Sequence, residues 1–239
     1  MIAVKQLKIA LMASVMAMAL MACTGSEYVV EDDVVVYSYW TFSFGQCYDT
    51  LPDADPATFK QVRNWLGHDS ERVYFEQELV PGVDVASLKV IRKPLFHDKK
   101  DYYYKTKPLH VADVESFKII KWYYDSFWAK DSRYAYFKDR RFEADVSTFK
   151  VESMAIAKDK YHVYYFGDLI PDADPSTFKQ IDNSVYFRDK SRIWCGSDLL
   201  EDVDYQTFEV DDFDIAHDKH GRFNGEKRDT IQPGYEITE

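Results

Sequence analysis

Short runs of alternating apolar and polar side chains recur along this chain. Within residues 141–166, Phe149-Lys150-Val151-Glu152 alternates, and Val163-Tyr164-Tyr165-Phe166 follows after a polar break at residues 159–162. Alternation with a period of two is typical of a half-buried strand, and a polar break of this length suits a tight loop. The pattern therefore predicts a β-hairpin.

The same pattern occurs six times, with a period of about thirty residues. In each repeat an Asp is followed four positions later by a large apolar residue: Asp55/Phe59, Asp84/Leu88, Asp113/Phe117, Asp145/Phe149, Asp174/Phe178 and Asp204/Phe208. A second Asp follows, at Asp69, Asp98, Asp131, Asp159, Asp189 and Asp218, and an aromatic ring stands five positions beyond it, at Tyr74, Tyr103, Tyr136, Tyr164, Trp194 and Phe223. Such a period is typical of stacked supersecondary units.

The first Asp of each repeat is expected to cap a turn, because its side chain can accept from backbone N–H groups two or three residues on. Since an isolated hairpin is barely stable, the repeats must bury their aromatic faces on one another. The sequence therefore predicts an all-β fold, a linear solenoid-like array of about six hairpin repeats with short capping turns. A propeller is disfavoured, because a blade needs four strands in about forty residues. Arg222 and Asn224, which flank Phe223, suit a polar cap on the last repeat.

The residues that carry the pattern, Asp-Pro-x-Thr-Phe-Lys and then Asp-Lys-x-x-Val-Tyr-Tyr, resemble the DKNYY family of bacterial repeat proteins. The clearest matches are residues 174–179 and 159–165, and the resemblance extends from about Leu51 to Phe223. Asp69 and Asp131 differ from the pattern, since each is followed by Ser instead of Lys. The resemblance implies a secreted or lipid-anchored bacterial protein and assigns no activity.

The first 22 residues combine a basic start, Lys5 and Lys8, with an apolar run from Ile9 to Leu20 that carries no charge. This run is too short to span a bilayer stably, and small residues follow it, as is typical of a secretory signal. Leu20-Met21-Ala22-Cys23 resembles the bacterial lipoprotein signal, in which the Cys becomes the lipidated first residue. We therefore expect lipidation at Cys23, with an ordinary signal peptide cut near Ala22 as the alternative.

The predicted organisation is a signal peptide over residues 1–22, a tether and degenerate leading strand over 23–46, a repeat domain over 47–225 and a C-terminal tail over 226–239. The leader carries two lysines and no acid, so its removal changes the formal net charge from −11 to −13. A chain this acidic is repelled by phosphate backbones, which argues against nucleic-acid binding. We expect a monomer held in the bacterial envelope by its lipid, on the outer membrane or the cell surface.

Candidate metal and catalytic groups belong to the repeat. The position before the second Asp holds His68, His97, Lys130, Lys158, Arg188 and His217 in turn. Because Lys cannot replace an imidazole ligand, we expect solvated turn charges here and no metal. Paired carboxylates such as Asp53 and Asp55 favour a capping Asp beside an exposed neighbour over a calcium site. The chain carries none of the common hydrolase or phosphate-binding motifs.

We therefore expect a non-enzymatic binding or interaction module without a cofactor, whose partner is an envelope protein, a peptide or a glycan. A carbohydrate hydrolase that uses a carboxylate pair is the alternative, because such pairs carry no spacing signal. A purely structural spacer is a third interpretation.

The third repeat contains an aromatic insertion that the repeat pattern does not explain. Its rings are Trp122, Tyr123, Tyr124, Phe127 and Trp128. Insertions in repeat arrays often map to a binding face, and Trp and Tyr dominate binding hot spots. We expect Trp122, Tyr124 and Trp128 to be partly exposed and to form the main contact surface. The alternative is a longer hairpin that places these rings in the core.

Cys47 and Cys195 occupy corresponding positions near the two ends of the array. A disulfide needs Cα atoms within about 7 Å. In a linear array the two residues lie several repeats apart, so unpaired thiols are predicted. A bridge between them would favour a closed ring.

Overall fold

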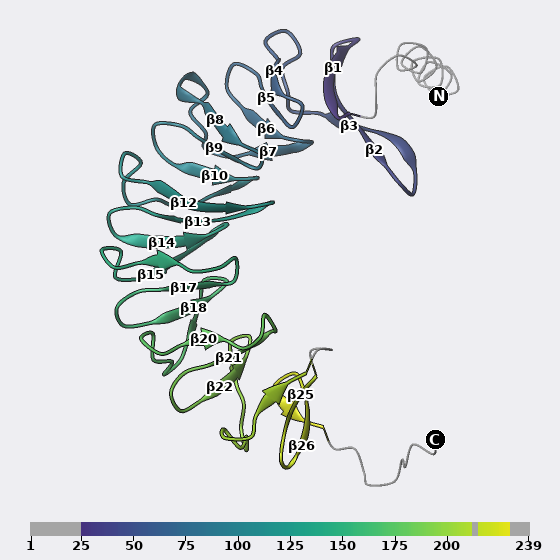
Figure 1. The fold of residues 1–239 in the computed structure, drawn as a ribbon. Helices are drawn as coiled ribbons and strands as arrows, with labels where there is room; N and C mark the ends of the chain where they lie inside the picture. Colours follow the sequence, from purple (N-terminus) through teal and green to yellow (C-terminus); the bar gives the residue numbers. More distant parts are fainter. Residues whose placement is uncertain (1–24, 212–214, 230–239) are drawn as a thin grey trace. The chain divides into compact units, whose positions relative to one another are not determined.

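The structure is a computed structural model of the chain, and it describes residues 25–211 and 215–229. Its strands form seven small antiparallel sheets that follow one another along the sequence (Figure 1). The predicted all-β class, built from repeated units, is confirmed. The predicted signal peptide and Cys23 lie outside the described residues. None of the helical segments in the described part is long and apolar enough to cross a membrane.

The chain divides into two compact units, residues 1–108 and 109–239. The described part of the first unit holds a leading sheet of three strands and two sheets of four strands. The second unit holds four sheets of four strands. The boundary between the units therefore falls between the second and third repeats.

The leading sheet consists of β1 (Glu27–Glu31), β2 (Val34–Thr41) and β3 (Gly45–Leu51), in that order. Asp32 and Asp33 form the two-residue turn between β1 and β2, both with positive φ. Asp tolerates this left-handed conformation better than most residues, and paired positive φ values match the strand twist of a tight hairpin. The expectation of a polar tether and a single leading strand over residues 23–46 is therefore wrong, because the acidic run is a hairpin turn.

Each repeat is a four-stranded meander in which every strand pairs with the next one along the chain. The sheets of the first unit are β4 (Lys60–Arg63), β5 (Leu66–His68), β6 (Val73–Phe75) and β7 (Glu78–Val80), then β8 (Lys89–Arg92), β9 (Leu95–His97), β10 (Tyr102–Tyr104) and β11 (Lys107–Pro108). A short 3-10 helix, η2 (Val85–Ser87), forms the turn before β8.

The first two sheets of the second unit are β12 (Lys118–Tyr123), β13 (Ser126–Lys130), β14 (Tyr134–Phe137) and β15 (Arg140–Glu143), then β16 (Lys150–Val151), β17 (Ile156–Lys158), β18 (Val163–Tyr165) and β19 (Asp168–Ile170). The last two are β20 (Lys179–Gln180), β21 (Tyr186–Arg188), β22 (Ile193–Cys195) and β23 (Asp198–Leu199), then β24 (Glu209–Val210), β25 (Ala216–Asp218), β26 (Gly221–Asn224) and β27 (Lys227–Arg228).

The repeat therefore holds more strands than the predicted hairpin. In the fourth repeat the predicted strands correspond to β16 and β18, and residues 159–162 form the turn that joins β17 to β18. The two strands that were not predicted, β17 and β19, are three residues long. Strands this short fit four into about thirty residues, and they are too short to display a period of two.

The six aromatic rings that follow the second Asp at five positions are all buried, as predicted. In the first unit, rings of neighbouring sheets share one core, as Trp65 and Phe96 show with ring centroids 6.5 Å apart. In the second unit three clusters each contain residues of two consecutive sheets. Consecutive sheets within each unit therefore pack on one another, which supplies the burial that a single meander lacks.

Tyr28 on β1 attaches the leading sheet to the first repeat. Its hydroxyl donates to the carbonyl of Glu76 at 2.8 Å, and its ring lies 5.3 Å from that of Phe59. Its backbone N–H donates to Gln61 Oε1 at 2.7 Å. Burial raises the pKa of the Tyr28 hydroxyl far above its ordinary value. The leading sheet is thus the first layer of the repeat core.

Three basic side chains join consecutive repeats of the second unit. They are Lys130, whose Nζ donates to the Val146 carbonyl at 2.5 Å, Lys158 to the Phe178 carbonyl at 2.6 Å, and Arg188 to the Tyr205 carbonyl at 3.3 Å. Each acceptor lies in the capping turn of the next repeat or at its end. The prediction of solvated turn charges is wrong for these three residues, because they are half-buried and satisfy turn carbonyls that would otherwise lack donors.

The last sheet extends past the predicted end of the repeat domain at residue 225. β27 pairs with β26 through Phe223–Arg228 and Asn224–Lys227. The chain beyond Gly225 is therefore part of the sixth repeat, at least as far as Arg228. Arg222 and Asn224 are exposed on either side of the buried Phe223, as the polar-cap prediction required.

Candidate functional site

The second Asp of each repeat is the centre of a buried hydrogen-bond network. In the fourth repeat, Asp159 Oδ1 accepts the backbone N–H groups of Tyr161 and His162, both at 2.7 Å. Its other oxygen, Oδ2, accepts the N–H of Asp145 at 2.8 Å and the hydroxyl of Tyr164 at 2.7 Å. One carboxylate thus holds the hairpin turn, the preceding capping turn and the buried tyrosine together.

The contact between the second Asp and the capping turn occurs in all six repeats. Oδ2 accepts the N–H of Asp55 (3.1 Å), Asp84 (2.6 Å), Ala112 (2.8 Å), Asp145 (2.8 Å), Asp174 (3.1 Å) and Asp204 (2.7 Å). The donor shifts to Ala112 only in the third repeat, which also carries the aromatic insertion. The two Asp positions of the sequence pattern are therefore one structural device.

A Ser or Thr hydroxyl completes this device. The third residue after the first Asp accepts the backbone N–H that follows the second Asp, at 3.0–3.2 Å: Thr58, Ser87, Ser116, Thr148, Thr177 and Thr207. In the second, fifth and sixth repeats, the Lys at the donor position also pairs with the first Asp: Lys99 with Asp84 at 2.8 Å, Lys190 with Asp174 at 2.9 Å, and Lys219 with Asp204. Because the essential donor is backbone, the Ser residues that follow Asp69 and Asp131 preserve the turn.

The buried carboxylates of Asp98 and Asp159 are held in their charged form. Burial raises the pKa of Asp98, but the backbone N–H groups of Asp84, Asp101 and Lys100 outweigh it, and the pKa lies below its ordinary value. The pKa of Asp159 is lowered against the same burial by three backbone N–H groups and the Tyr164 hydroxyl. A general acid needs a raised pKa and access to substrate. These carboxylates have neither.

In the sixth repeat an arginine takes the place of two missing donors. Phe223 stands where the first four repeats carry a tyrosine, and no hydrogen bond joins the Gly221 N–H to the Asp218 carboxylate, as the corresponding N–H does in the other five repeats. Arg228 binds both oxygens of Asp218, at 2.7 and 2.8 Å. This contact is the main reason that the pKa of Asp218 is lowered. The repeat carboxylate is thus satisfied in structure and is not a candidate catalytic group.

The aromatic insertion extends the β12–β13 hairpin, and it places most of its rings inward. Phe127 and Trp128 are fully buried, at 0% exposure each, and Trp128 Nε1 donates to the Met154 carbonyl at 2.9 Å. Trp122 and Tyr123 are half-buried, whereas Tyr124 is 91% exposed at the turn. The expectation that Trp128 is partly exposed is wrong, because the longer hairpin points this ring into the core shared with the fourth repeat. A contact role for Trp122 and Tyr124 stays a prediction.

Two of the histidines considered as metal ligands hydrogen-bond to the backbone. His68 and His97 each place Nδ1 against the carbonyl of the following Asp, at 2.7 and 3.0 Å. No group of three or more His, Cys, Asp or Glu side chains in residues 25–211 and 215–229 could hold a metal ion. Cys47 and Cys195 are free thiols, each half-buried.

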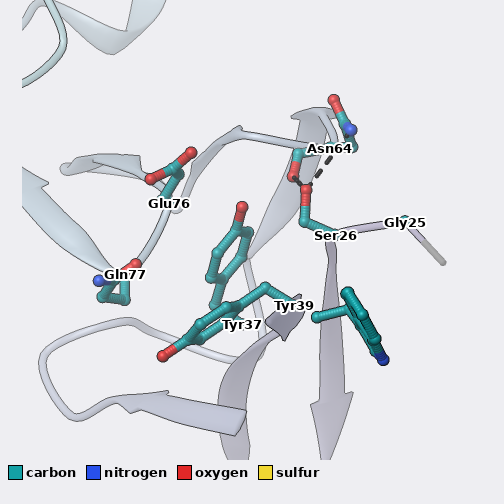
Figure 2. Close-up of a pocket in the computed structure, with 8 residues that line it drawn as sticks. Gly25, Ser26, Tyr37, Tyr39, Asn64, Glu76 and Gln77 are labelled. Carbon is teal, nitrogen blue, oxygen red and sulfur yellow. Dashed lines mark hydrogen bonds between the residues drawn. The ribbon is translucent and has the colours of Figure 1, made fainter. Parts of the chain in front are cut away.

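A cleft of about 460 Å³ opens in the first unit between the leading sheet and the first repeat (Figure 2). Tyr37, Tyr39 and Trp40 line it from β2, Gly25 and Ser26 from the chain before β1, and Asn64, Glu76 and Gln77 from two turns of the first repeat. The Tyr37 and Tyr39 rings stack with centroids 5.7 Å apart. The cleft thus combines aromatic rings with amide, hydroxyl and carboxylate groups.

Glu76 is the one carboxylate among the residues that line this cleft. It pairs with Lys93 at 2.7 Å. Ser26 Oγ donates to the Asn64 carbonyl at 3.0 Å and fixes the edge of the cleft to the turn between β4 and β5. The sequence did not predict this site, because its residues come from four separate segments and none belongs to the repeat pattern.

The structure is that of an all-β repeat protein. The residues that define the repeat stabilise its turns and core, whereas the cleft and the exposed rings lie in the leading sheet and at single turns. The chain belongs to the DKNYY family: the model of that family matches residues 3–107 and again residues 68–198. The family resemblance in the sequence is therefore confirmed. No curated protein and no solved structure matches the chain.

Proposed function

We propose that this chain is a lipid-anchored protein of the bacterial envelope, fixed through Cys23, that binds a glycan in the cleft of the leading sheet. The observation that carries the proposal is the composition of the cleft, with the rings of Tyr39 and Trp40 beside the side chains of Asn64, Glu76 and Gln77. Aromatic faces pack against sugar rings, and a small number of polar groups fixes the orientation of a ligand. The linear, solenoid-like arrangement of the repeats is part of the same proposal.

Binding is favoured over hydrolysis by the number of acids. A glycosidase needs two carboxyl groups on either side of the scissile bond. The cleft offers Glu76 alone, and this carboxylate is already paired with Lys93. The second Asp of each repeat is buried inside the turn that it stabilises. The cleft therefore suits a site that holds a sugar chain without cleaving it.

The binding experiment uses the mature protein and soluble fragments of bacterial cell-wall glycans, with titration calorimetry as the measurement. We expect Tyr39→Ala and Gln77→Ala each to weaken binding about tenfold or more, while the control Tyr161→Ala, an exposed ring in the fourth repeat, binds as the parent does. Equal binding by all variants would remove the cleft as the site. Release of shortened glycan that Glu76→Gln abolishes would establish the hydrolase alternative.

Anchoring is tested separately by cell fractionation. Replacement of Cys23 by Ser is expected to move the protein from the membrane fraction to the soluble fraction. If the Ser variant stays in the membrane fraction and no unprocessed chain accumulates, the lipid anchor is wrong. A protein that is anchored but binds no glycan would support the structural spacer.

A further inference from the structure

The turn between β2 and β3 exposes large apolar rings outside the repeat core. Phe42 is 98% exposed and Phe44 is 83% exposed, and the adjoining Trp40 is 44% exposed. Trp40 and Phe42 contact each other edge to face, with ring centroids 4.9 Å apart. A cluster of this kind in contact with water is unfavourable unless something covers it.

The hairpin is also uncharged. From Val34 to Tyr48 the sequence contains no Asp, Glu, Lys or Arg, in a chain of which 30% is charged. One pair of polar groups bonds within the turn: the N–H of Phe44 donates to Thr41 Oγ1 at 3.1 Å. Farther along the hairpin, Gln46 Nε2 donates to Ser38 Oγ at 2.6 Å. Each of these internal bonds lowers the cost of moving its polar groups out of water.

The sheet topology places this turn at the same end as the incoming chain. β1 runs antiparallel to β2 with Glu27 opposite Ser38, so the chain before Glu27 leaves the sheet where β2 approaches its turn. The acidic turn at Asp32 and Asp33 lies at the opposite end. Gly25 and Trp40 both line the cleft. Figure 2 labels Gly25 and Ser26 among its lining residues.

The position of Cys23 follows from chain length. Two residues extend at most about 7 Å, so the Cα of Cys23 lies within that distance of Gly25, whatever path the chain takes. A lipid on Cys23 would therefore bring the bilayer surface to the end of the sheet that carries Phe42 and Phe44.

We propose that the β2–β3 hairpin inserts its tip, Phe42 and Phe44, into the lipid–water interface beside the lipidated N-terminus. The inference rests on the anchoring part of the proposed function and not on glycan binding. Aromatic side chains concentrate in the interfacial layer of membranes, where an apolar ring and a nearby polar group are both satisfied. Because the hairpin carries no charge, it can approach a lipid surface without electrostatic repulsion. An acidic protein surface would be repelled by anionic headgroups.

The hairpin adds a second contact at a fixed distance from the first. A single lipid tether lets a protein turn freely at the surface, whereas a second contact sets the orientation of the sheet. Trp40, which lines the cleft and contacts Phe42, then lies next to the inserted tip, and the rest of the cleft stays on the water side. The contact is expected to orient the protein more than to strengthen its attachment.

The experiment uses the lipidated protein in phosphatidylcholine vesicles whose acyl chains are brominated. Trp40 is the most exposed of the described tryptophans, since Trp65, Trp128 and Trp194 are buried and Trp122 is half-buried. We expect brominated lipid to quench the emission of Trp40 relative to plain lipid, and Trp40→Phe to remove at least half of the total quenching. Phe42→Ser combined with Phe44→Ser should reduce the quenching severalfold while the protein stays anchored.

Tyr124→Ser, at an exposed turn of the third repeat, is the matched control and should leave the quenching unchanged. Since Phe42 and Phe44 are exposed, their replacement should not alter the thermal midpoint or glycan binding. Absence of quenching in the anchored parent protein would overturn the inference. So would a dimer, seen by sedimentation of the lipid-free Cys23→Ser protein, that the double Phe variant dissociates, because the rings would then cover a second copy of the chain. Loss of glycan binding in Tyr39→Ala with quenching retained separates this proposal from that of the cleft.

Discussion

Asp159 accepts the backbone N–H of Asp145 at 2.8 Å, fourteen residues earlier in the chain. The bond ties the turn of the central hairpin to the turn that opens the repeat. Thr148 Oγ1 adds a second tie from the opening turn, because it accepts the N–H of Lys160 at 3.0 Å. Each repeat is thereby closed by its own polar residues before it packs on its neighbours.

Asp159→Asn replaces one carboxylate oxygen by an NH2 group, and we expect this small change to destabilise the protein strongly. The amide keeps one acceptor oxygen, so either the Tyr161 and His162 amides or the Asp145 amide and Tyr164 hydroxyl lose their partner. We expect a loss of about 2–3 kcal/mol, since a buried donor without a partner carries its full desolvation penalty. Thermal unfolding measures it. The exposed Asp53→Asn should change the midpoint little, and an equal effect of the two substitutions would contradict the role of burial.

Two buried tyrosines at equivalent positions should respond differently to removal of the hydroxyl. Tyr164 donates to Asp159, whereas the Tyr74 hydroxyl is buried and makes no hydrogen bond to any described residue. Tyr164→Phe is expected to cost about 1–2 kcal/mol, because a bond to a charged acceptor is lost. Tyr74→Phe should be neutral or slightly stabilising. Urea unfolding of the two variants checks the difference, and destabilisation by Tyr74→Phe would reveal a partner for its hydroxyl.

Stability should decline in acid below about pH 4. Burial opposes the charge of Asp69, Asp98, Asp131 and Asp159, but their hydrogen bonds outweigh it, and the folded pKa of each lies below the ordinary value of 3.8. A carboxyl with a lowered folded pKa stabilises the protein fully above its unfolded pKa. That contribution is lost as the pH falls through the folded pKa.

The thermal midpoint should therefore change little with these groups between pH 5 and 8 and fall below pH 4. The Asp159→Asn variant should show a shallower acid decline than the parent, because one titrating group is gone. Parallel declines for the two proteins would show that other groups dominate acid unfolding.

Trp128 and Tyr124 provide a direct test of the corrected aromatic insertion. Trp128→Ala is expected to cost about 3–5 kcal/mol, because it leaves a cavity in the core and removes the donor to the Met154 carbonyl. Tyr124→Asn should have little effect on stability, since the residue is exposed at a positive φ that Asn adopts readily. Differential scanning calorimetry distinguishes the two. Small effects from both substitutions would contradict the burial of Trp128.

The sequence predicted the parts of the fold that repeat. Six-fold agreement in spacing identified the capping turns, the buried ring after the second Asp and the all-β class. It missed strands such as β17, because the small residues Ala155 and Ala157 pack between sheets without showing alternation. Burial of the second Asp was also missed, because the backbone donors that make it tolerable are not visible in a side-chain pattern.

The candidate site was beyond sequence reasoning for a different reason. The leading sheet lacks the repeat signature, so its residues were treated as a tether. The cleft joins Ser26 to Asn64 and Tyr39 to Gln77, and these pairs are close only because β1 docks on the first repeat. The uncharged stretch from Val34 to Tyr48 was the one signal that could have marked this region in advance.

The forward contacts of Lys130, Lys158 and Arg188 give the second unit a direction. Each cation belongs to one repeat and its acceptor to the next, so the two ends of a row of repeats are chemically different. A row cut after a donor exposes a cation that water can solvate, and a row cut before an acceptor exposes a carbonyl that water can also satisfy. A repeat duplicated in tandem brings its own donor and its own acceptor, so a longer row needs no new residue at the junction. Growth by duplication is thus built into the chemistry of the boundary.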